Sequence, residues 1–165
     1  MISLKIKKTN ININQKIYDR CIEEVGVHTL KCSCGRHEMV KHGYYKRKVK
    51  TAVGVVIIKI LRVKCKACNT THAILLALIV PYQRIQLNIQ IKILDKSVDD
   101  ETIMINNSTI SEQDMHRVRK RYKAHYEGWM KTTHLTFKSD LVTAAYESFK
   151  SNFMQIKNKK RYILV

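Results

Sequence analysis

Two close pairs of cysteines constrain this chain more than any other feature. Cys32 and Cys34 form the first pair, Cys65 and Cys68 form the second, and a basic stretch with strand-like alternation separates them. Thiolates that lie two or three positions apart face one point while the backbone turns around it. Two such turns joined by a β-hairpin supply the four sulfur ligands of a tetrahedral zinc site. We therefore interpret residues 29–75 as a zinc ribbon that binds Zn²⁺.

The ligand set leaves alternatives open. Gly35 and Asn69 follow the two pairs, and both residue types tolerate the positive φ that a metal knuckle requires. The first pair is one residue shorter than usual, so a histidine is an alternative ligand in place of one sulfur: His37, His42 or His72. Reduced, half-buried cysteines and disulfides are the competing interpretations. The fifth cysteine, Cys21, lies in a helical pattern and is expected in the core.

The composition indicates a polyanionic partner. The 165 residues include 31 Lys and Arg against 13 Asp and Glu, a formal net charge of +18. Residues 1–84 and 111–165 are strongly basic, whereas residues 85–110 are not, which is typical of two nucleic-acid contact surfaces. The alternative is a set of solvated lysines, which we favour for Lys157 to Arg161. No apolar run is long enough to span a membrane, and no signal peptide is recognised at Met1, so we expect a cytoplasmic protein.

The patterning predicts an α+β fold, in which a zinc-ribbon β-hairpin is followed by a small helical bundle. Three regions are expected: residues 1–28 with an edge strand over 1–8 and a helix over 14–25, a ribbon over 29–84, and helices over 85–165. Strands 38–51 and 55–64 form the hairpin around the turn Ala52-Val53-Gly54. The second strand is apolar on both faces, so we expect the rest of the chain to cover it.

The region after Pro81 is predicted to be helical. Residues 85–98 alternate like a strand but also fit a helix, which we favour because helices follow. A helix over 111–130 begins with a capping-box-like Ser111 and Asp114. With a short helix over 98–105 and a turn at 106–108, it has the outline of a helix-turn-helix. A last helix is expected near 139–156.

Two sets of side chains are candidates for contact with double-stranded DNA. The hairpin combines rings that stack with cations that neutralise phosphate, in Tyr44, Tyr45, Lys46, Arg47, Lys48 and Lys50. The polar face of the 111–130 helix presents Arg117, Lys120 and Arg121. The alternatives are hairpin packing for the tyrosines and a merely charged surface for the helix.

The order of these motifs resembles a known family. C-S-C-G, K-H-G-Y-Y-K-R, L-R-V-K-C-K-A-C-N-T-T-H-A-I-L-L and V-P-Y-Q-R-I are similar to small bacterial zinc-ribbon proteins with a domain-of-unknown-function label. That family looks like the N-terminal ribbon of insertion-sequence transposases. The resemblance implies a zinc ribbon with a helical DNA-binding part, and Cys32, Cys34, Cys65 and Cys68 as metal ligands. Asn69 stands where the family usually has glycine.

We expect a protein without catalytic activity. The acidic residues after Arg84 cluster before or on helices, and no phosphate loop or nucleophile elbow is present. The favoured function is a zinc-dependent DNA-binding protein, transposon-associated or regulatory. The alternatives are an adaptor that docks on a larger nucleic-acid machine through the apolar run Ile74 to Val80, and a shortened transposase relic. RNA in place of DNA, a partner protein and a homodimer are further options.

Overall fold

The computed structural model describes residues 1–6, 11–96, 98–155 and 163–164. Ile156, the segment 157–161 and the end of the strand expected over 1–8 lie outside the described residues. Within them the chain is a mixed α+β structure, as predicted. Its elements in chain order are β1 (Ile2–Leu4), α1 (Gln15–Val25), the 3₁₀ turn η1 (Val27–Thr29), β2 (Met39–Thr51), β3 (Gly54–Cys65), β4 (Thr71–Leu76), α2 (Leu87–Asp95), α3 (Asp100–Asn106), α4 (Glu112–His125), α5 (Glu127–Thr132), α6 (Leu141–Phe149) and β5 (Ile163–Leu164).

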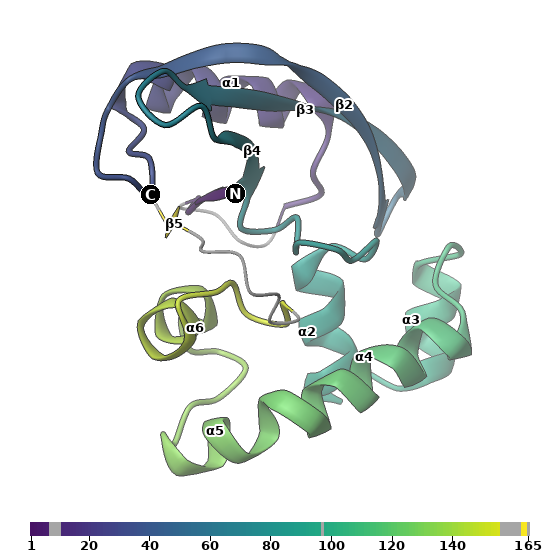
Figure 1. Cartoon of the computed structure of the whole chain (residues 1–165). Helices are drawn as coiled ribbons and strands as arrows, with labels where there is room; N and C mark the ends of the chain where they lie inside the picture. Colours follow the sequence, from purple (N-terminus) through teal and green to yellow (C-terminus); the bar gives the residue numbers. More distant parts are fainter. Residues whose placement is uncertain (7–10, 97, 156–162, 165) are drawn as a thin grey trace.

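The predicted hairpin dominates a sheet whose described strands follow the order β2-β3-β4-β1-β5. β2 and β3 are antiparallel and pair from Met39↔Cys65 to Thr51↔Gly54, so the chain reverses within two residues. Gly54 has φ 127°, a conformation that side-chain-bearing residues rarely adopt, which is why glycine stands at this turn. Figure 1 shows the hairpin curving over the upper part of the molecule. The pairing brings both cysteine pairs to its open end.

The N-terminal strand forms as predicted, but its expected place at the sheet edge is wrong. β1 lies between β4 and β5 and runs parallel to both. Ile2, Ser3 and Leu4 are all buried, as is usual for a parallel strand that is covered on both faces. At the edge of the sheet, the strand would have left one row of its backbone N–H and C=O groups unpaired. Parallel pairing with β4 therefore explains why this short segment carries two large apolar residues.

Helix α1 forms where the four-residue spacing predicts it. The Asn14 side chain accepts a hydrogen bond from the Ile17 N–H, and Gly26 at φ 70° ends the helix. Tyr18 is buried against the sheet, where its hydroxyl donates to Ile74 O and accepts from the Leu61 N–H, both at 2.9 Å. Figure 1 shows α1 lying along the hairpin, while α2 to α6 gather below the sheet.

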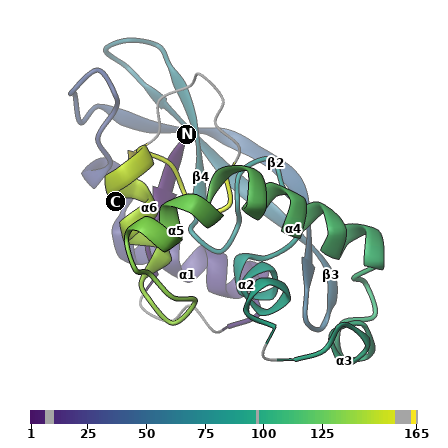
Figure 2. The same ribbon diagram turned by 90° about the horizontal axis from the view of Figure 1, so that it is seen from below.

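One of the helices predicted after β4 is divided in the structure. Residues 87–95 are helical, as favoured, but the helix expected over 111–130 is divided at Tyr126, which separates α4 from α5. The Tyr126 hydroxyl donates to Gln155 O at 2.7 Å and its ring packs edge-on against Phe149 and Phe153, so tertiary contacts override local helix preference. Figure 2 shows α4 and α5 following one another across the helical side.

The last helix is shorter than expected. α6 ends at Phe149 because Lys150 adopts a left-handed conformation at φ 53°. Residues 151–155 are buried in a non-helical segment, and the Asn152 amide donates to Ala77 O at 2.8 Å. Hydrogen bonds to the loop after β4 thus take the place of helical hydrogen bonds here. The predicted start of the helix is confirmed by Asp140, which accepts from the Thr143 N–H.

The distribution of apolar side chains corrects two further expectations. The run Ile74 to Val80 is buried throughout, so it cannot be a docking surface. On β3 the inward-facing Ile58 and Ile60 are buried, but Val55 and Ile57 are about half exposed, at 50% and 53%. The distal half of the hairpin is therefore not covered on its outer face. No helix in the described ranges is both long and apolar enough to cross a bilayer.

Candidate metal centre and basic surfaces

The four paired cysteines meet at the open end of the hairpin. Cys32 and Cys34 lie in the turn before β2, Cys65 is the last residue of β3, and Cys68 lies in the turn that leads to β4. All four sulfur atoms are within 4.8 Å of one another. Cys32 and Cys65 are buried, whereas Cys34 and Cys68 are exposed. The sequence therefore predicted the membership of this cluster correctly.

Two backbone turns aim the thiols at one point. In the first, the Gly35 N–H donates to Cys32 O at 2.9 Å, and Gly35 has φ 90°. In the second, the Cys65 N–H donates to Thr70 O at 3.0 Å, and Asn69 has φ 59°. Both positions expected to need a positive φ have one. Asn69 in place of glycine is compatible with the second turn, because asparagine tolerates the left-handed region.

The sulfur spacings fit a four-coordinate metal ion. The Cys32 and Cys68 sulfurs are 3.5 Å apart, and the Cys34 and Cys65 sulfurs are 3.7 Å apart. A tetrahedron with metal–sulfur bonds of about 2.3 Å has sulfur–sulfur edges of roughly 3.8 Å. All five cysteines are free, so the pairs are not disulfides. The donor set is close enough to hold a metal ion, and its soft thiols suit Zn²⁺.

The pKa values of the clustered thiols also favour the binding of a cation. Hydrogen bonds from the Thr70 hydroxyl and N–H lower the pKa of the Cys68 thiol to about 6. At Cys34 the Arg36 N–H lowers the pKa, but burial and the three neighbouring thiols together raise it to about 11. Four thiolates at this spacing repel one another, so some keep their protons unless a positive ion replaces them.

His72 supports the cluster from one side. Its Nε2 lies 3.2 Å from the Cys32 sulfur, and its Nδ1 lies 3.2 Å from the amino group of Met1. The amine donates to Nδ1, so the neutral ring carries its proton on Nε2 and donates to the sulfur. Burial, and next the charge of the amine, lower the pKa of His72 to about 4. Of the three histidines considered as ligands, His37 and His42 are exposed and outside the cluster.

Cys21 does not belong to the metal cluster. It lies in α1, is half-buried and packs against the hydrophobic core. Burial raises the pKa of its thiol. The expectation of a core cysteine is therefore met in part, because its side chain still reaches solvent.

The structure divides the hairpin candidates for nucleic-acid contact into two groups. Lys46 and Lys48 are exposed on β2 and Tyr44 is 55% exposed, while Tyr45 is half-buried. Arg47 instead donates to Val80 O at 2.6 Å and to Gln83 O at 2.8 Å. Lys50 pairs with Asp114 of α4 at 2.5 Å. Arg47 and Lys50 thus hold the hairpin to the loop after β4 and to α4.

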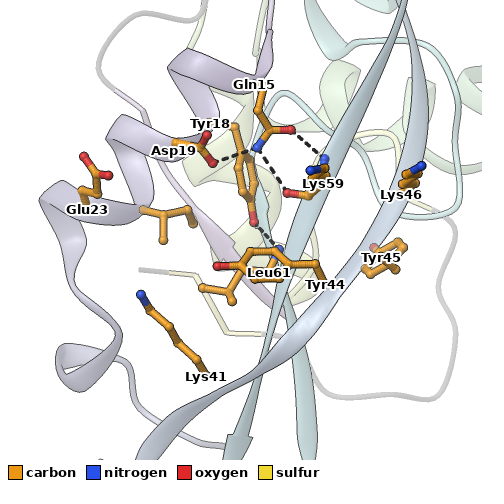
Figure 3. Close-up of a pocket in the computed structure, with 11 residues that line it drawn as sticks. Gln15, Tyr18, Asp19, Glu23, Lys41, Tyr44, Tyr45, Lys46, Lys59 and Leu61 are labelled. Atoms are coloured by element: carbon orange, nitrogen blue, oxygen red, sulfur yellow. Dashed lines mark hydrogen bonds between the residues drawn. The ribbon is translucent and has the colours of Figure 1, made fainter.

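A groove of about 710 Å³ runs between α1 and the hairpin, as Figure 3 shows. Lys41, Lys46 and Lys59 border it on the sheet side, and Asp19 and Glu23 border it on the helix side. The Gln15 side chain crosses from α1 to β3 and accepts from the Lys59 N–H at 2.7 Å. Because both charge signs meet here, the groove is less suited to a polyanion than the hairpin beyond it.

The candidates on α4 also differ in exposure. Arg117 and Lys120 are exposed, whereas Arg121 is half-buried and its Nη1 donates to Gln83 Oε1 at 2.7 Å. Burial lowers the pKa of Arg121, although the guanidinium keeps its charge. The structure adds two residues that sequence reasoning missed, Tyr82 and Arg84, which line a small pocket with Arg117 and Arg121. The signal for them was the Y-Q-R triplet directly after Pro81.

Comparison with known proteins gives one result. No curated protein and no solved structure matches the chain. A family model does match, and the matched segment begins at Cys32 and ends in the first turn of α4, so it contains all four clustered cysteines. Residues 32–113 of the chain match the model of DUF6431, a domain of unknown function.

Proposed function

We propose that the protein is a zinc-dependent DNA-binding protein, transposon-associated or regulatory, without catalytic activity of its own. The observation that carries the proposal is the cluster of four thiols at the base of a long, cationic hairpin. In this view the zinc ion joins the turn before β2 to the turn after β3 and makes the segment a zinc ribbon. A strongly positive chain supplies the attraction to a polyanion.

The outer face of the hairpin is the first surface that supports DNA binding. Lys46 lies opposite Lys59 at the edge of the α1 groove, and Lys48 lies opposite Ile57 beyond that groove, so cations and an exposed apolar side chain share one face. A two-stranded ribbon fits the major groove of B-DNA, where lysines reach phosphates or guanine edges and apolar groups contact thymine methyls. Arg47 and Lys50 act indirectly, because they fix the hairpin to the helical part.

The exposed side of α4 is the second surface. Arg117 and Lys120 project from it, and the Ser111 capping box fixes its start. α4 packs against α2, and Arg119 pairs with Asp100 of α3. In a helix-turn-helix arrangement, α4 would be the helix that enters the groove and α3 the helix that precedes it.

The metal site and the acidic residues both support a function without catalysis. Four protein ligands fill a tetrahedral zinc, so no position is open for water or substrate. The acids near the helices have structural partners: Asp99 caps α3, Asp100 pairs with Arg119 and Asp114 pairs with Lys50. They are engaged in holding the fold rather than grouped around a second metal.

Duplex binding as a function of salt tests the proposal. Fluorescence anisotropy with a labelled duplex should show binding that weakens steeply between about 50 and 200 mM salt. Lys46→Ala with Lys48→Ala should reduce the slope of log K against log salt by roughly two. Lys16→Ala, which removes an exposed cation from α1, is the control. Metal analysis should give one zinc per chain, and no duplex binding at low salt would reject the proposal.

An adaptor function is the second candidate, favoured by one observation. Val53, Val55 and Ile57 are exposed along the distal hairpin, at 50% or more. Such a patch suits a partner protein or a second copy of the chain. Capture of a defined partner that persists in high salt and after nuclease treatment, and is lost in Ile57→Lys, would favour this function. Competition with single strands would distinguish RNA from duplex DNA.

A further inference from the structure

We propose that the loop after β4 and the exposed side of α4 together form a binding pocket for one phosphate group of a nucleic acid. This inference rests on the proposed nucleic-acid binding and assigns it a specific site. The pocket, called the arginine pocket below, has a volume of about 180 Å³. Tyr82 and Arg84 line it from the loop, and Arg117 and Arg121 line it from α4.

The arginine pocket carries an excess of positive charge. Three guanidinium groups converge on the pocket, and Asp114 is the one carboxylate among its described lining residues. Asp114 is already engaged by Lys50 at 2.5 Å, and its closest approach to Arg117 is 4.0 Å. Within the described parts of the chain, no ion pair is found for Arg84 or Arg121. Such a group of like charges is favourable only when an anion joins it.

The loop that lines the arginine pocket is held in place by hydrogen bonds from three sides. The Gln83 amide reaches in two directions: its Oε1 accepts from Arg121 at 2.7 Å, and its Nε2 donates to Met154 O. Arg47 donates to two carbonyls of the loop, and the Lys50 N–H donates to Arg84 O at 2.6 Å. The loop is therefore fixed from β2, from α4 and from the C-terminal segment before any ligand binds. Preorganised donors bind an anion at low entropic cost.

Tyr82 adopts an unusual backbone conformation at the arginine pocket. Its backbone has φ 61°, which is strained for an aromatic residue, and its side chain is 53% exposed. Strain of this kind persists where the surrounding contacts enforce it and clusters at binding sites. The ring stands at the rim of the arginine pocket, where it can contact the sugar or base attached to a bound phosphate.

The size of the pocket selects the ligand. Sites for drug-sized molecules have volumes of about 300 to 1,000 Å³, so this one takes a single small group rather than a whole nucleotide. The planar, multidentate donors of arginine match the tetrahedral oxygens of phosphate. The phosphate belongs either to the backbone of a strand or to its 5′ end, and both present the same chemistry to the pocket.

Titration with inorganic phosphate, followed by amide NMR at constant ionic strength, tests the pocket directly. Signals of residues 82–85 and 117–121 should shift with saturation in the millimolar range, about 1 to 10 mM. Arg84→Ala and Arg117→Ala should each weaken this binding about tenfold. Lys123→Ala, which removes an exposed α4 cation outside the pocket, should leave it unchanged. Equal shifts at the hairpin lysines, with no effect of the arginine variants, would overturn the proposal.

Oligonucleotide binding distinguishes a backbone phosphate from a terminal phosphate. It also distinguishes a failure of the pocket assignment from a failure of the proposed function. If Arg117→Ala weakens an unphosphorylated duplex about tenfold more than Lys123→Ala does, the pocket takes a backbone phosphate. A loss seen only with 5′-phosphorylated strands assigns it to a terminal phosphate. If Arg84→Ala, Arg117→Ala and Lys123→Ala all weaken duplex binding equally, the pocket is rejected but the proposed function is not. Phosphate binding in the pocket without any oligonucleotide binding would reject the proposed function and the nucleic-acid assignment.

Discussion

At the scale of single residues, the two buried sulfurs connect the metal cluster to the fold. Cys32 and Cys65 are almost fully buried, at 2% and 0% exposure, and both belong to the hydrophobic core. Cys34 and Cys68 complete the set from the solvent side. A metal ion bound here therefore joins an exposed turn to the core, and losing it leaves thiols in contact with apolar side chains.

Cys65→Ser should abolish stoichiometric zinc binding and lower the melting temperature by about 10 °C or more. The site forms only in the folded state, so the free energy of metal binding adds to the free energy of folding. Native mass spectrometry and thermal unfolding measure the two effects. Cys21→Ser is the matched control, since Cys21 lies outside the cluster, and it should keep one zinc per chain. An unchanged melting temperature in Cys65→Ser would refute the metal assignment.

His72→Phe should weaken zinc binding about 10- to 100-fold, the usual cost of removing a hydrogen bond to a ligand. The imidazole at 3.2 Å from the Cys32 sulfur donates to the thiolate, and phenylalanine fills the space without donating. Competition with a chromophoric chelator measures the affinity. His37→Phe, at an exposed position, should have no effect. Complete loss of zinc in His72→Phe would instead indicate that the histidine is itself a ligand.

Single-residue roles were predictable where chemistry and spacing determine them. Four cysteines in two pairs have few other uses, so the cluster followed from the sequence. The roles of Arg47 and Lys50 did not, because their partners lie more than thirty residues away along the chain, with sequence separations of 33 and 64. A basic residue in a basic strand looks the same whether it faces phosphate or a buried carbonyl.

At the scale of elements, an ion pair ties α3 to α4. Arg119 Nη1 donates to Asp100 Oδ2 at 2.7 Å, and this hydrogen bond is the largest of the effects that hold the pKa of Asp100 below its usual range. A lowered pKa means that the folded state favours the charged carboxylate. Its contribution to stability is present above the unfolded-state pKa of about 3.9 and is lost as the pH falls through the folded-state value.

Asp100→Asn should therefore lower the free energy of unfolding at pH 6 by no more than about 1 kcal/mol, since both partners are partly exposed at 35% and 47%. The difference between the variant and the original protein should shrink as the pH falls through the lowered folded-state pKa of Asp100, below which the carboxylate is protonated in both states. Denaturant unfolding of both proteins at each pH measures it. Glu101→Gln, the neighbouring acid, controls for the helix dipole. A difference that persists at low pH would exclude the ion pair as its cause.

Element types were predictable from local signals, whereas several boundaries were not. Asn14, Asp99 and Ser111 all cap helices, as their positions before apolar-periodic runs suggest. The break at Tyr126 was not visible, because the apolar stripe of the predicted 111–130 helix continues through it at helical spacing, over Met115, Val118, Tyr122, Tyr126 and Trp129. It depends on Phe149, Phe153 and Gln155, which meet the tyrosine only in the folded chain.

At the scale of the whole molecule, one hydrophobic core connects the sheet with the helices. Buried residues from β1, the hairpin, α2, α4 and α6 belong to a single cluster, with Ile2, Ile58, Ile93, Met115 and Val142 as examples. The sequence predicts three regions: an N-terminal segment, a ribbon and a helical region. Because these regions share one core, an unfolding experiment can test whether they behave as separate units. Regions that share a core tend to unfold together.

The zinc-loaded protein should accordingly unfold in one cooperative thermal transition. A chelator should move that transition to lower temperature without splitting it, because Cys32 and Cys65 are part of the shared core and removing the ion loosens the packing on which the helices rest. Differential scanning calorimetry shows the number of transitions, and hydrogen exchange in α5 and α6 shows whether the effect reaches the helices. Two transitions, of which only one responds to the chelator, would establish the ribbon and the helical region as independent folding units and confine the effect of the metal to the hairpin.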